Sequence, residues 1–361
     1  MRVSSLVFLF LILFASSQAY SDERIKIGVP TALSGDAATF GVDIRNALEL
    51  ANDKLGRGRY ELIFEDERCS NREAVSVAQK FINLHKVKYA LGFPCNQTLL
   101  ATADLYNRAN ILVITASATS GDVTGLGRSI FRLFPSDVLG ADLLYSHISI
   151  KTKRLLIVTE QSEFPVLMDR SIRRFNSLSR TPIEISSIEF SHGDGDLKTQ
   201  LLSAIQKGVD GVFINTNTDA SFIPVTKQLS DIKYHGARYA IYLPSSSSVL
   251  QALGGAVNGI EFANLPLNDQ LVTESGAVLL KEFKTRYGEP QSGFPVVPMA
   301  LESFRLLDLA LNSKVDPIEF LKKGNFQDGF IPTYHFDEDG AVAGIGFQMQ
   351  RIDAGKVVVI K

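Results

Sequence analysis

The chain has 361 residues, with 37 basic and 39 acidic side chains and a formal net charge of −2 at pH 7. Such a balance excludes nucleic-acid and anionic-membrane binders that depend on a strong basic patch. The length predicts two domains, each large enough to bury a hydrophobic core of its own.

Residues 1–19 have the features of a secretory signal peptide. Arg2 is the only charged residue before Asp22, and residues 6–15 form a short apolar core. Ser17-Gln18-Ala19 then has the small-x-small pattern of a cleavage site. A membrane anchor is the alternative, but the apolar run is well short of the roughly 18 residues that a spanning helix needs. We therefore expect cleavage of this segment and a soluble mature chain in the periplasm.

The segment directly behind it, Ile25–Gly41, predicts the start of an α/β domain. Its first five residues, 25–29, are rich in β-branched side chains, and a small-residue loop containing Ser34-Gly35 follows. Apolar residues then recur at helical spacing from Val42 to Leu55. Strand, polar loop and helix in this order also form the first binding loop of such a domain.

Strand-like and helix-like segments alternate along nearly the whole chain. The predicted strands are Arg24–Val29, Tyr60–Asp66, Tyr89–Phe93, Ile111–Thr115, Arg154–Thr159, Ile183–Phe190, Gly211–Asn215 and Arg238–Leu243. Predicted helices between them include Arg72–His85, Asp137–Ile150, Leu197–Lys207 and Ala220–Ile232. Continuous apolar runs such as Leu155–Val158 are typical of parallel strands that helices cover on both faces. Two such units, before and after about Pro135, predict an α/β fold of two doubly wound domains.

The pattern changes near the end of the chain. Two predicted helices, Ser275–Tyr287 and Val297–Leu311, follow Pro266 without a strand between them. Three short strand-like runs separated by turn residues come last: Tyr334–Asp337, Gly346–Arg351 and Lys356–Ile360. This order predicts three crossings between the domains, near Pro135, Leu265 and Asp328–Pro332, which together would make a hinge. We expect one lobe from residues 24–135 plus 266–330, and the other from 136–265 plus 331–361.

Cys69 and Cys95 are the only cysteines. An even pair in an oxidising compartment is most simply a disulfide. Each follows a predicted strand, and the ends of neighbouring parallel strands lie close enough for disulfide geometry. A metal site would need more ligands, and no His or Cys lies at useful spacing. We predict a Cys69–Cys95 disulfide and no metal.

Signals for catalysis are weak. The five histidines are scattered without an HExxH pair, and there is no GxSxG nucleophile elbow. The three glycines of residues 121–127 lack the GxGxxG spacing of a phosphate loop. The serine run Ser245–Ser248 has no acid or base near it in sequence and is typical of a loop or a helix N-cap. We expect neither an enzyme nor a cofactor.

Small polar residues gather instead where predicted strands end. The loops in question are Thr31–Gly41, Asn96–Thr98, Ser117–Ser120, Glu160–Phe164, Asn215–Asp219 and Ser245–Ser248. Loops are polar in any protein and helices need polar caps, so one such loop carries little information. Ligands of doubly wound sheets bind outside the carboxyl ends of the strands, so six such loops in two facing domains predict a shared cleft.

Five segments carry a family resemblance. They are IKIGVPTALSGDAATFG (25–41), YELIFEDERCSNREAVSVAQKFI (60–82), KYALGFPC (88–95), ILVITASATS (111–120) and TYHFDEDG (333–340). With these motifs the chain resembles the type I periplasmic binding proteins, in the leucine/isoleucine/valine-binding branch that serves ABC transporters. The resemblance covers essentially all of the mature chain. It implies two Rossmann-like lobes joined by a three-strand hinge, with a disulfide at the two cysteines.

The resemblance also implies a ligand site. In the family, a serine-threonine loop after the fourth strand grips the ligand α-carboxylate, and an aromatic residue from each lobe packs on the ligand. The matching or neighbouring positions here are Phe40, Asn96, Gln97, Ser117, Ala118, Thr119, Phe164, Asn217 and Ser245. Three of them depart from the family pattern: Asn96 stands for a serine, Asn217 for an aromatic, and Ser245 for the acid that pairs with the ligand ammonium.

The missing acid bears on the ligand. A buried ammonium without a carboxylate partner costs several kcal/mol, so a free aliphatic amino acid fits poorly unless Glu160, Glu163 or Asp219 reaches the cleft. A carboxylate, an amide or an aromatic acid would suit the remaining donors better. The resemblance implies a monomeric periplasmic solute-binding protein that delivers a small polar ligand to an ABC-transporter permease. The alternative is a ligand-sensing module that docks onto a membrane receptor or kinase.

Overall fold

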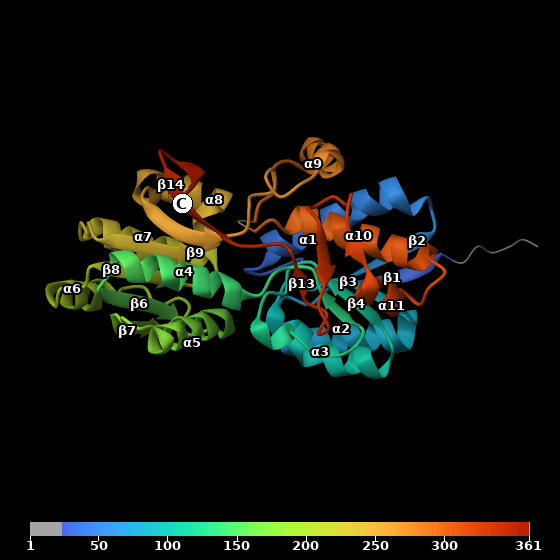
Figure 1. The fold of residues 1–361 in the computed structure, drawn as a ribbon, viewed down its shortest axis with the longest axis horizontal. Coiled ribbons are helices and arrows are strands. Elements are labelled where there is room, and N and C mark those ends of the chain that lie inside the picture. Colours follow the sequence, from blue (N-terminus) through green and yellow to red (C-terminus); the bar gives the residue numbers. More distant parts are fainter. Residues whose placement is uncertain (1–23, 293, 361) are drawn as a thin grey trace, which may run out of the picture.

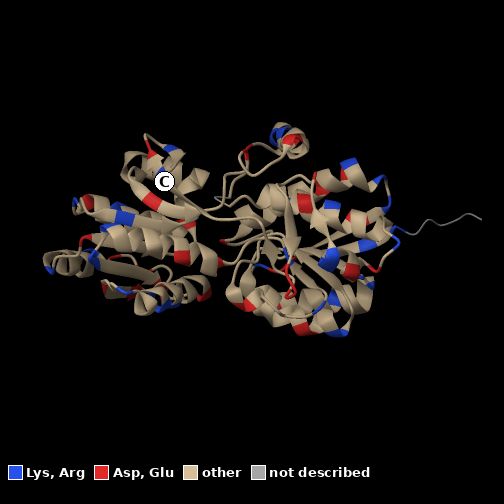
Figure 2. Ribbon diagram, viewed as in Figure 1, with Lys and Arg blue, Asp and Glu red and all other residues tan. Residues whose placement is uncertain are grey.

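The computed structural model describes residues 24–292 and 294–360, which form two α/β lobes side by side (Figure 1). The predicted signal peptide lies outside the described residues. Basic and acidic residues are both scattered along the ribbon of the two lobes (Figure 2). None of the helices in the described part of the chain is both long and apolar enough to cross a membrane.

The first lobe is built on a parallel sheet in the order β2-β1-β3-β4-β5. Its strands are β1 Ile25–Thr31, β2 Tyr60–Asp66, β3 Tyr89–Gly92, β4 Leu112–Thr115 and β5 Ile130–Arg132. Its helices are α1 Ala38–Ala51, α2 Asn71–Lys80, α3 Asn96–Arg108, α9 Glu274–Tyr287, α10 Val296–Asn312 and α11 Pro317–Lys323. Helices cover both faces of this sheet: Ile114 packs in the same core as α1 and α10, whereas Val113 packs with α2 and α3.

The second lobe has a seven-stranded sheet in the order β15-β14-β10-β9-β8-β6-β7. Its strands are β6 Arg154–Glu160, β7 Glu184–Phe190, β8 Gly211–Asn215, β9 Ala237–Ile241, β10 Ile260–Asn264, β14 Gln348–Asp353 and β15 Lys356–Val359. Its helices are α4 Asp137–Lys151, α5 Glu163–Leu178, α6 Lys198–Gln206, α7 Asp219–Asp231 and α8 Ser247–Leu253. Strands β6 to β10 are parallel, and the final hairpin β14–β15 joins β10 in antiparallel orientation.

The third crossing differs from its expected position near Asp328–Pro332. A small sheet of β11 Asn325–Phe326, β12 Tyr334–Phe336 and β13 Val342–Ala343 still packs on the first lobe. There Ala341 pairs with Arg132 next to β5, and the ring of Phe336 lies 5.1 Å from that of Phe131. Assigning residues 331–343 to the second lobe was therefore wrong. The aromatic side chains of this segment are buried against the first lobe, and the chain enters the second sheet only with β14.

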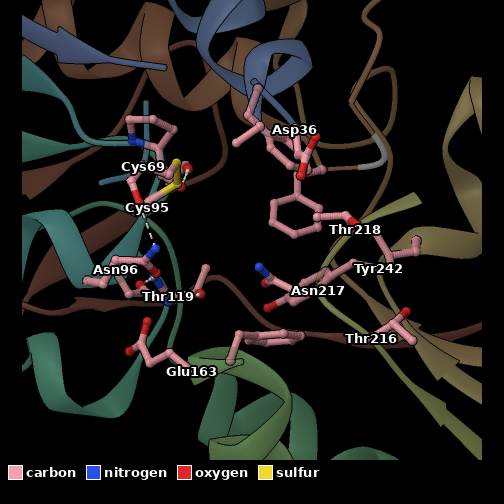
Figure 3. A pocket seen from close by; sticks show the side chains of 18 of the residues that line it. Asp36, Cys69, Cys95, Asn96, Thr119, Glu163, Thr216, Asn217, Thr218 and Tyr242 are labelled. Atoms are coloured by element: carbon pink, nitrogen blue, oxygen red, sulfur yellow. Dashed lines mark hydrogen bonds between the residues drawn. A yellow bond between two sulfur atoms is a disulfide. The ribbon is translucent and has the colours of Figure 1, made fainter. Parts of the chain in front are cut away.

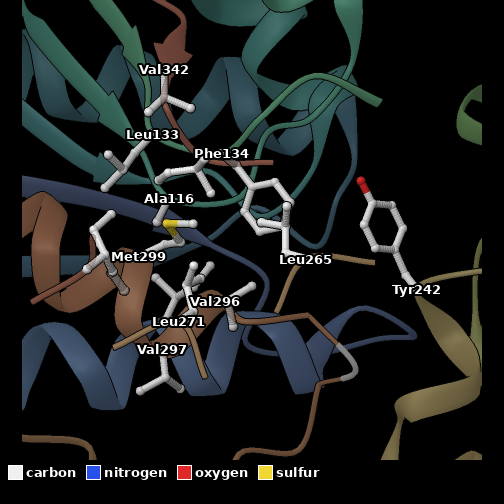
Figure 4. Packing of buried hydrophobic residues seen from close by; sticks show 14 of the residues in the cluster. Ala116, Leu133, Phe134, Tyr242, Leu265, Leu271, Val296, Val297, Met299 and Val342 are labelled. Atoms are coloured by element: carbon white, nitrogen blue, oxygen red, sulfur yellow. The ribbon is translucent and has the colours of Figure 1, made fainter. Parts of the chain in front are cut away.

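A continuous hydrophobic core runs through the connection between the lobes. Phe134 and Leu265, at the first two crossings, are fully buried in the same cluster as Met299 of the first lobe and Tyr242 of the second. Figure 4 shows Tyr242 reaching from the second lobe toward these side chains. The crossing segments are thus packed, and this packing sets where the two lobes face each other.

Candidate ligand-binding site

A cavity of about 310 Å³ lies between the lobes at the carboxyl ends of both parallel sheets. On the first lobe, residues that follow β1, β2, β3 and β4 line it, and on the second lobe residues that follow or end β6, β7, β8 and β9 do so. Parallel strands bring their carboxyl ends to one edge of a sheet, so two facing sheets place eight loops around one volume (Figure 3). We call this volume the cavity.

Seven of the nine predicted site residues line the cavity, namely Phe40, Asn96, Gln97, Ser117, Thr119, Phe164 and Asn217. The other two lie outside it. Ala118 is buried behind its loop, where its N–H donates to Thr115 Oγ1 at 3.1 Å. The Ser245 hydroxyl donates to the carbonyl oxygen of Tyr242 at 2.8 Å and accepts from Asn264 Nδ2 at 3.1 Å. Position 245 therefore supports a turn.

Asn96 is bonded to the loop after β4. Its Oδ1 accepts the backbone N–H of Thr119 at 2.6 Å and that of Ser120 at 2.9 Å, and its Nδ2 lies 3.4 Å from Thr119 Oγ1 (Figure 3). From behind, the buried Arg132 guanidinium donates to the carbonyl oxygens of Thr119 and Ser120 at 3.1 and 2.8 Å. Two N–H groups of the predicted carboxylate grip are thus satisfied within the protein.

Glu163 is the main residue that sequence reasoning left undecided. It lies in the first turn of α5 and lines the cavity, and its Oε1 is buried without a hydrogen-bond partner among the described residues. Burial raises the pKa of its carboxyl to about 7, and the charges of Asp137 and Asp122 add to the shift. The cavity therefore contains a carboxyl group whose negative charge the protein does not neutralise.

Glu160 and His192 link the lobes at the cavity. Glu160, buried at the end of β6, accepts the backbone N–H of Asn217 at 2.7 Å, and its Oε1 lies 3.3 Å from His192 Nδ1. The other ring nitrogen of His192 lies 3.6 Å from Asp36 Oδ2 of the first lobe. Asp219, the third acid considered, bonds to the Ser246 hydroxyl at 2.6 Å and does not line the cavity.

Aromatic rings from both lobes form one wall of the cavity. Tyr242 follows β9, and its ring centroid lies 4.3 Å from that of Phe294 and 6.0 Å from that of Phe164. Phe40 lies 4.9 Å from Phe294. The Tyr242 hydroxyl donates to Asp137 Oδ1 at 2.6 Å, and burial raises the pKa of the Asp137 carboxyl to about 6.

Sequence reasoning did not select several of these residues. His192 follows a predicted strand, so applying the strand-end rule to every strand would have found it. Tyr242 lies inside the predicted strand Arg238–Leu243, whereas the observed β9 ends at Ile241. Phe294 lies in the loop before α10, which follows no strand, and no sequence signal marks it.

The predicted disulfide is confirmed. Cys69 and Cys95 are bonded, with Cα atoms 5.6 Å apart, and both line the cavity. They connect the loop after β2 to the residue before α3, and Gln97 Nε2 donates to the Cys69 carbonyl oxygen at 2.8 Å. The covalent link therefore ties the loop after β2 to the start of α3, where Asn96 and Gln97 lie.

Two α/β lobes, three crossings and a cavity at the carboxyl ends of both sheets define a type I periplasmic binding protein. The model of the periplasmic binding protein family matches residues 24–308, and the chain belongs to that family. The hydroxyl, amide, carboxyl and aromatic groups around the enclosed volume suit reversible binding of a small polar molecule.

Known proteins resemble the chain over nearly its full length. A Leu/Ile/Val/Thr-binding protein of Salmonella typhimurium is 23% identical over 92% of each chain. A leucine-binding protein of Thermotoga maritima superposes with a TM-score of 0.82 at 19% identity, covering 93% of this chain and 98% of that chain. The solute-binding protein of an ABC transporter from R. palustris, solved with benzoate, gives 0.80 at 16% identity, with 93% and 95% covered. These structural likenesses support the fold.

Proposed function

We propose that this protein is a periplasmic solute-binding protein that closes its lobes on a small polar ligand and delivers it to an ABC-transporter permease. The observation that carries the proposal is the cavity, whose lining comes from the strand ends of both lobes. A ligand that contacts both walls binds the closed arrangement better than the open one and therefore favours closure. The family membership supports the same function, as do a relative named as an amino-acid-binding protein and a solute-binding protein solved with benzoate.

The proposed ligand contacts are the seven predicted residues that line the cavity. Ser117, Thr119, Asn96 and Gln97 supply polar groups on the first lobe, and Asn217 supplies one on the second. The rings of Phe40 and Phe164 pack against the ligand. Ala118 and Ser245 support the loops without touching it.

We further propose how the chain is divided and where it works. The first lobe comprises residues 24–135 plus 266–343, and the second comprises 136–265 plus 344–360. Residues 1–19 direct export and are removed, and the mature protein acts as a monomer in the periplasm. It releases its ligand chemically unchanged.

A thermal-shift screen of the protein without residues 1–19 tests the proposal. The compounds are amino acids, amides, aromatic acids, amidines and urea-like molecules, and a ligand present at about 100 times its Kd stabilises the folded state by about 2.7 kcal/mol. We expect at least one compound to raise Tm, Phe164→Ala to weaken its binding, and small-angle scattering to show a smaller radius with ligand. Failure of every compound to stabilise the protein would contradict the proposal.

An uptake measurement separates transport from the alternative, sensing. Deleting the gene should abolish uptake of the identified ligand by cells. If the purified protein binds the ligand but uptake is unchanged, the sensing module is the correct function.

A further inference from the structure

The cavity already holds an internal substitute for a ligand carboxylate. Asn96 Oδ1 accepts the N–H groups of Thr119 and Ser120, at 2.6 and 2.9 Å. The Ser117 hydroxyl donates to the carbonyl oxygen of Pro94 at 3.2 Å. A carboxylate arriving at this loop would have to displace the Asn96 amide oxygen, so it would exchange one acceptor for another instead of gaining new hydrogen bonds.

The charges that line the cavity are paired, with one exception. His192 lies against both Asp36 and Glu160, and Arg68 lies 3.7 Å from Asp66 and donates to Ser34. Glu163 has no hydrogen bond or ion pair to any described residue. The charges that act on its carboxyl are those of Asp137 and Asp122, and both are negative.

Two further features of the lining favour a positive group. The aromatic rings of Phe40, Phe164, Tyr242 and Phe294 line the cavity, and the face of an aromatic ring attracts cations. The Thr216 hydroxyl, on the second-lobe wall, is buried without a hydrogen-bond partner in the described part of the chain. It can accept a hydrogen bond from an N–H of a ligand.

We infer that the cavity takes a ligand with a cationic nitrogen group, such as an ammonium, amidinium or guanidinium, and that the Glu163 carboxylate binds this group. Asn96 Oδ1 already accepts the N–H groups at which the family resemblance predicted a ligand carboxylate, so the ligand needs none. This inference rests on the proposed function, because it names the ligand class of the same site. It reverses the preference for a carboxylate that the missing acid at position 245 suggested, since Glu163 supplies an acid from α5.

Protonation of Glu163 makes the inference testable through pH. Its raised pKa of about 7 means that the carboxyl is largely neutral near pH 5.5 and largely ionised near pH 8. A cation should therefore bind more tightly at the higher pH. Four other charged or titratable side chains line the same cavity, on the loops after β1 and β2, at the end of β6 and on the loop after β7: Asp36, Arg68, Glu160 and His192. The charges of Asp137, at the start of α4, and of Asp122, in the segment after β4, act on Glu163.

The experiment uses two sets of probes. Within each set the carbon skeleton is constant, and the functional group is positive, neutral or negative. The sets are benzamidine, benzamide and benzoate, and isovaleramidine, isovaleramide and isovalerate. Thermal shift and calorimetry near pH 8 and near pH 5.5 are run on the mature protein, on Glu163→Gln and on Glu189→Gln. Glu189 is exposed on β7 of the same lobe and lies outside the cavity, so it is a matched control.

We expect the amidine of at least one set to bind the wild type at least tenfold more tightly than the carboxylate near pH 8. Glu163→Gln should weaken amidine binding by about tenfold to a hundredfold, as expected for losing a hydrogen bond to a charged group. Amidine binding to Glu163→Gln should also lose most of its pH dependence, whereas amidine binding to Glu189→Gln should match that of the wild type. Asn96→Ser should tighten carboxylate binding, because it releases the N–H groups of Thr119 and Ser120.

Three results would overturn the inference. In the first, a carboxylate binds best and Glu163→Gln does not weaken binding, so the solute-binding function stands with another ligand class. In the second, the amidines bind but Glu163→Gln leaves their affinity unchanged. In the third, no probe stabilises the wild type, and the broad ligand screen then decides the proposed function separately.

Discussion

Tyr242 of the second lobe has a strained backbone, and its ring contacts Phe294 of the first lobe. Its φ of +58° is a conformation that side chains other than glycine rarely adopt, and it costs about 1–3 kcal/mol. The surroundings maintain it: the ring is buried between Phe294 and Phe164, and the hydroxyl donates to the buried Asp137. A strained residue held by contacts from both lobes is the kind of position through which a ligand site reports on lobe closure.

Removing that hydroxyl should destabilise the protein in a pH-dependent way. In Tyr242→Phe the Asp137 carboxylate loses a donor, which costs about 1–3 kcal/mol near pH 8. The pKa of Asp137 in the folded protein is already raised to about 6, so its carboxyl loses its proton at a higher pH in the folded state than in the unfolded state. The stability of the wild type therefore falls as the pH rises from about 4 through 6. The variant should raise this pKa further, and its deficit should shrink near pH 5. Urea denaturation at both pH values measures it.

Tyr234→Phe is the matched control for that measurement. The Tyr234 hydroxyl is buried without a hydrogen-bond partner among the described residues, so its removal should be neutral or stabilising. Equal losses in the two variants, independent of pH, would show that the Tyr242–Asp137 hydrogen bond does not support the fold.

At the scale of elements, the disulfide fixes two loops of the cavity. Removing it with Cys69→Ser and Cys95→Ser together should cost roughly 3–4 kcal/mol, the chain-entropy value for a loop of this length. Because Gln97 bonds to the Cys69 carbonyl, ligand affinity should fall as well. Thermal melts and calorimetry of the double variant check both effects.

Mass spectrometry of the non-reduced, exported protein gives an independent check. It should find no free thiol, since the two cysteines are bonded to each other. Two alkylatable cysteines in the native protein, or a double variant that melts with the wild type, would contradict the structural role.

The elements that sequence predicted well are those whose signal is local. The predicted strands β2 and β8 have their observed ends, and the predicted helices α4 and α10 agree with the structure to within one residue at each end. The third crossing was misplaced because a three-residue strand such as β12 carries no local sign of which lobe buries it. Its position depends on contacts with residues about 200 positions earlier, such as that of Phe336 with Phe131.

The residues of the candidate site likewise divide into those that the sequence predicted and those that depend on contacts between distant residues. The strand-end rule and the family resemblance found most residues of the first-lobe wall, because those loops follow strands in a fixed order. The roles of Asn96 and Glu163 depend on which partner each side chain meets. Asn96 meets Thr119, 23 residues away, and Glu163 meets no partner at all in the described structure. The spacing of these residues along the sequence does not indicate either property.

At the scale of the whole molecule, the lobes contact each other on both sides of the cavity. The hinge side is aromatic and buried, whereas the opposite side has the Asp36–His192–Glu160 bridge, in which Asp36 and His192 are more than half exposed. Exposed ion pairs contribute about 0–1 kcal/mol. The bridge is therefore suited to bias closure without locking it.

His192→Ala should shift the protein toward an open arrangement. We expect a larger radius of gyration without ligand and a ligand Kd raised by up to about fivefold, since the binding-competent state becomes less populated. Lys198→Ala is the control, because the Lys198–Asp231 pair is similarly exposed but lies within the second lobe. Scattering curves and affinities that match between the two variants would rule out a role of the bridge in closure.

Because β14 comes late in the chain, the residues that line the cavity are synthesised before the second sheet is complete. During synthesis the last described lining residue, Phe294, is made well before residues 348–359, yet β10 has no partner on its outer edge until β14 pairs with it. Without β14, the edge of β10, the strand that contains the buried Phe262 and Ala263, would have unpaired backbone N–H and C=O groups that can pair with a strand of another chain. The final hairpin therefore protects the protein against aggregation. A chain that ended after residue 343 would keep every described lining residue of the cavity, but β10 would be an edge strand able to pair with other chains.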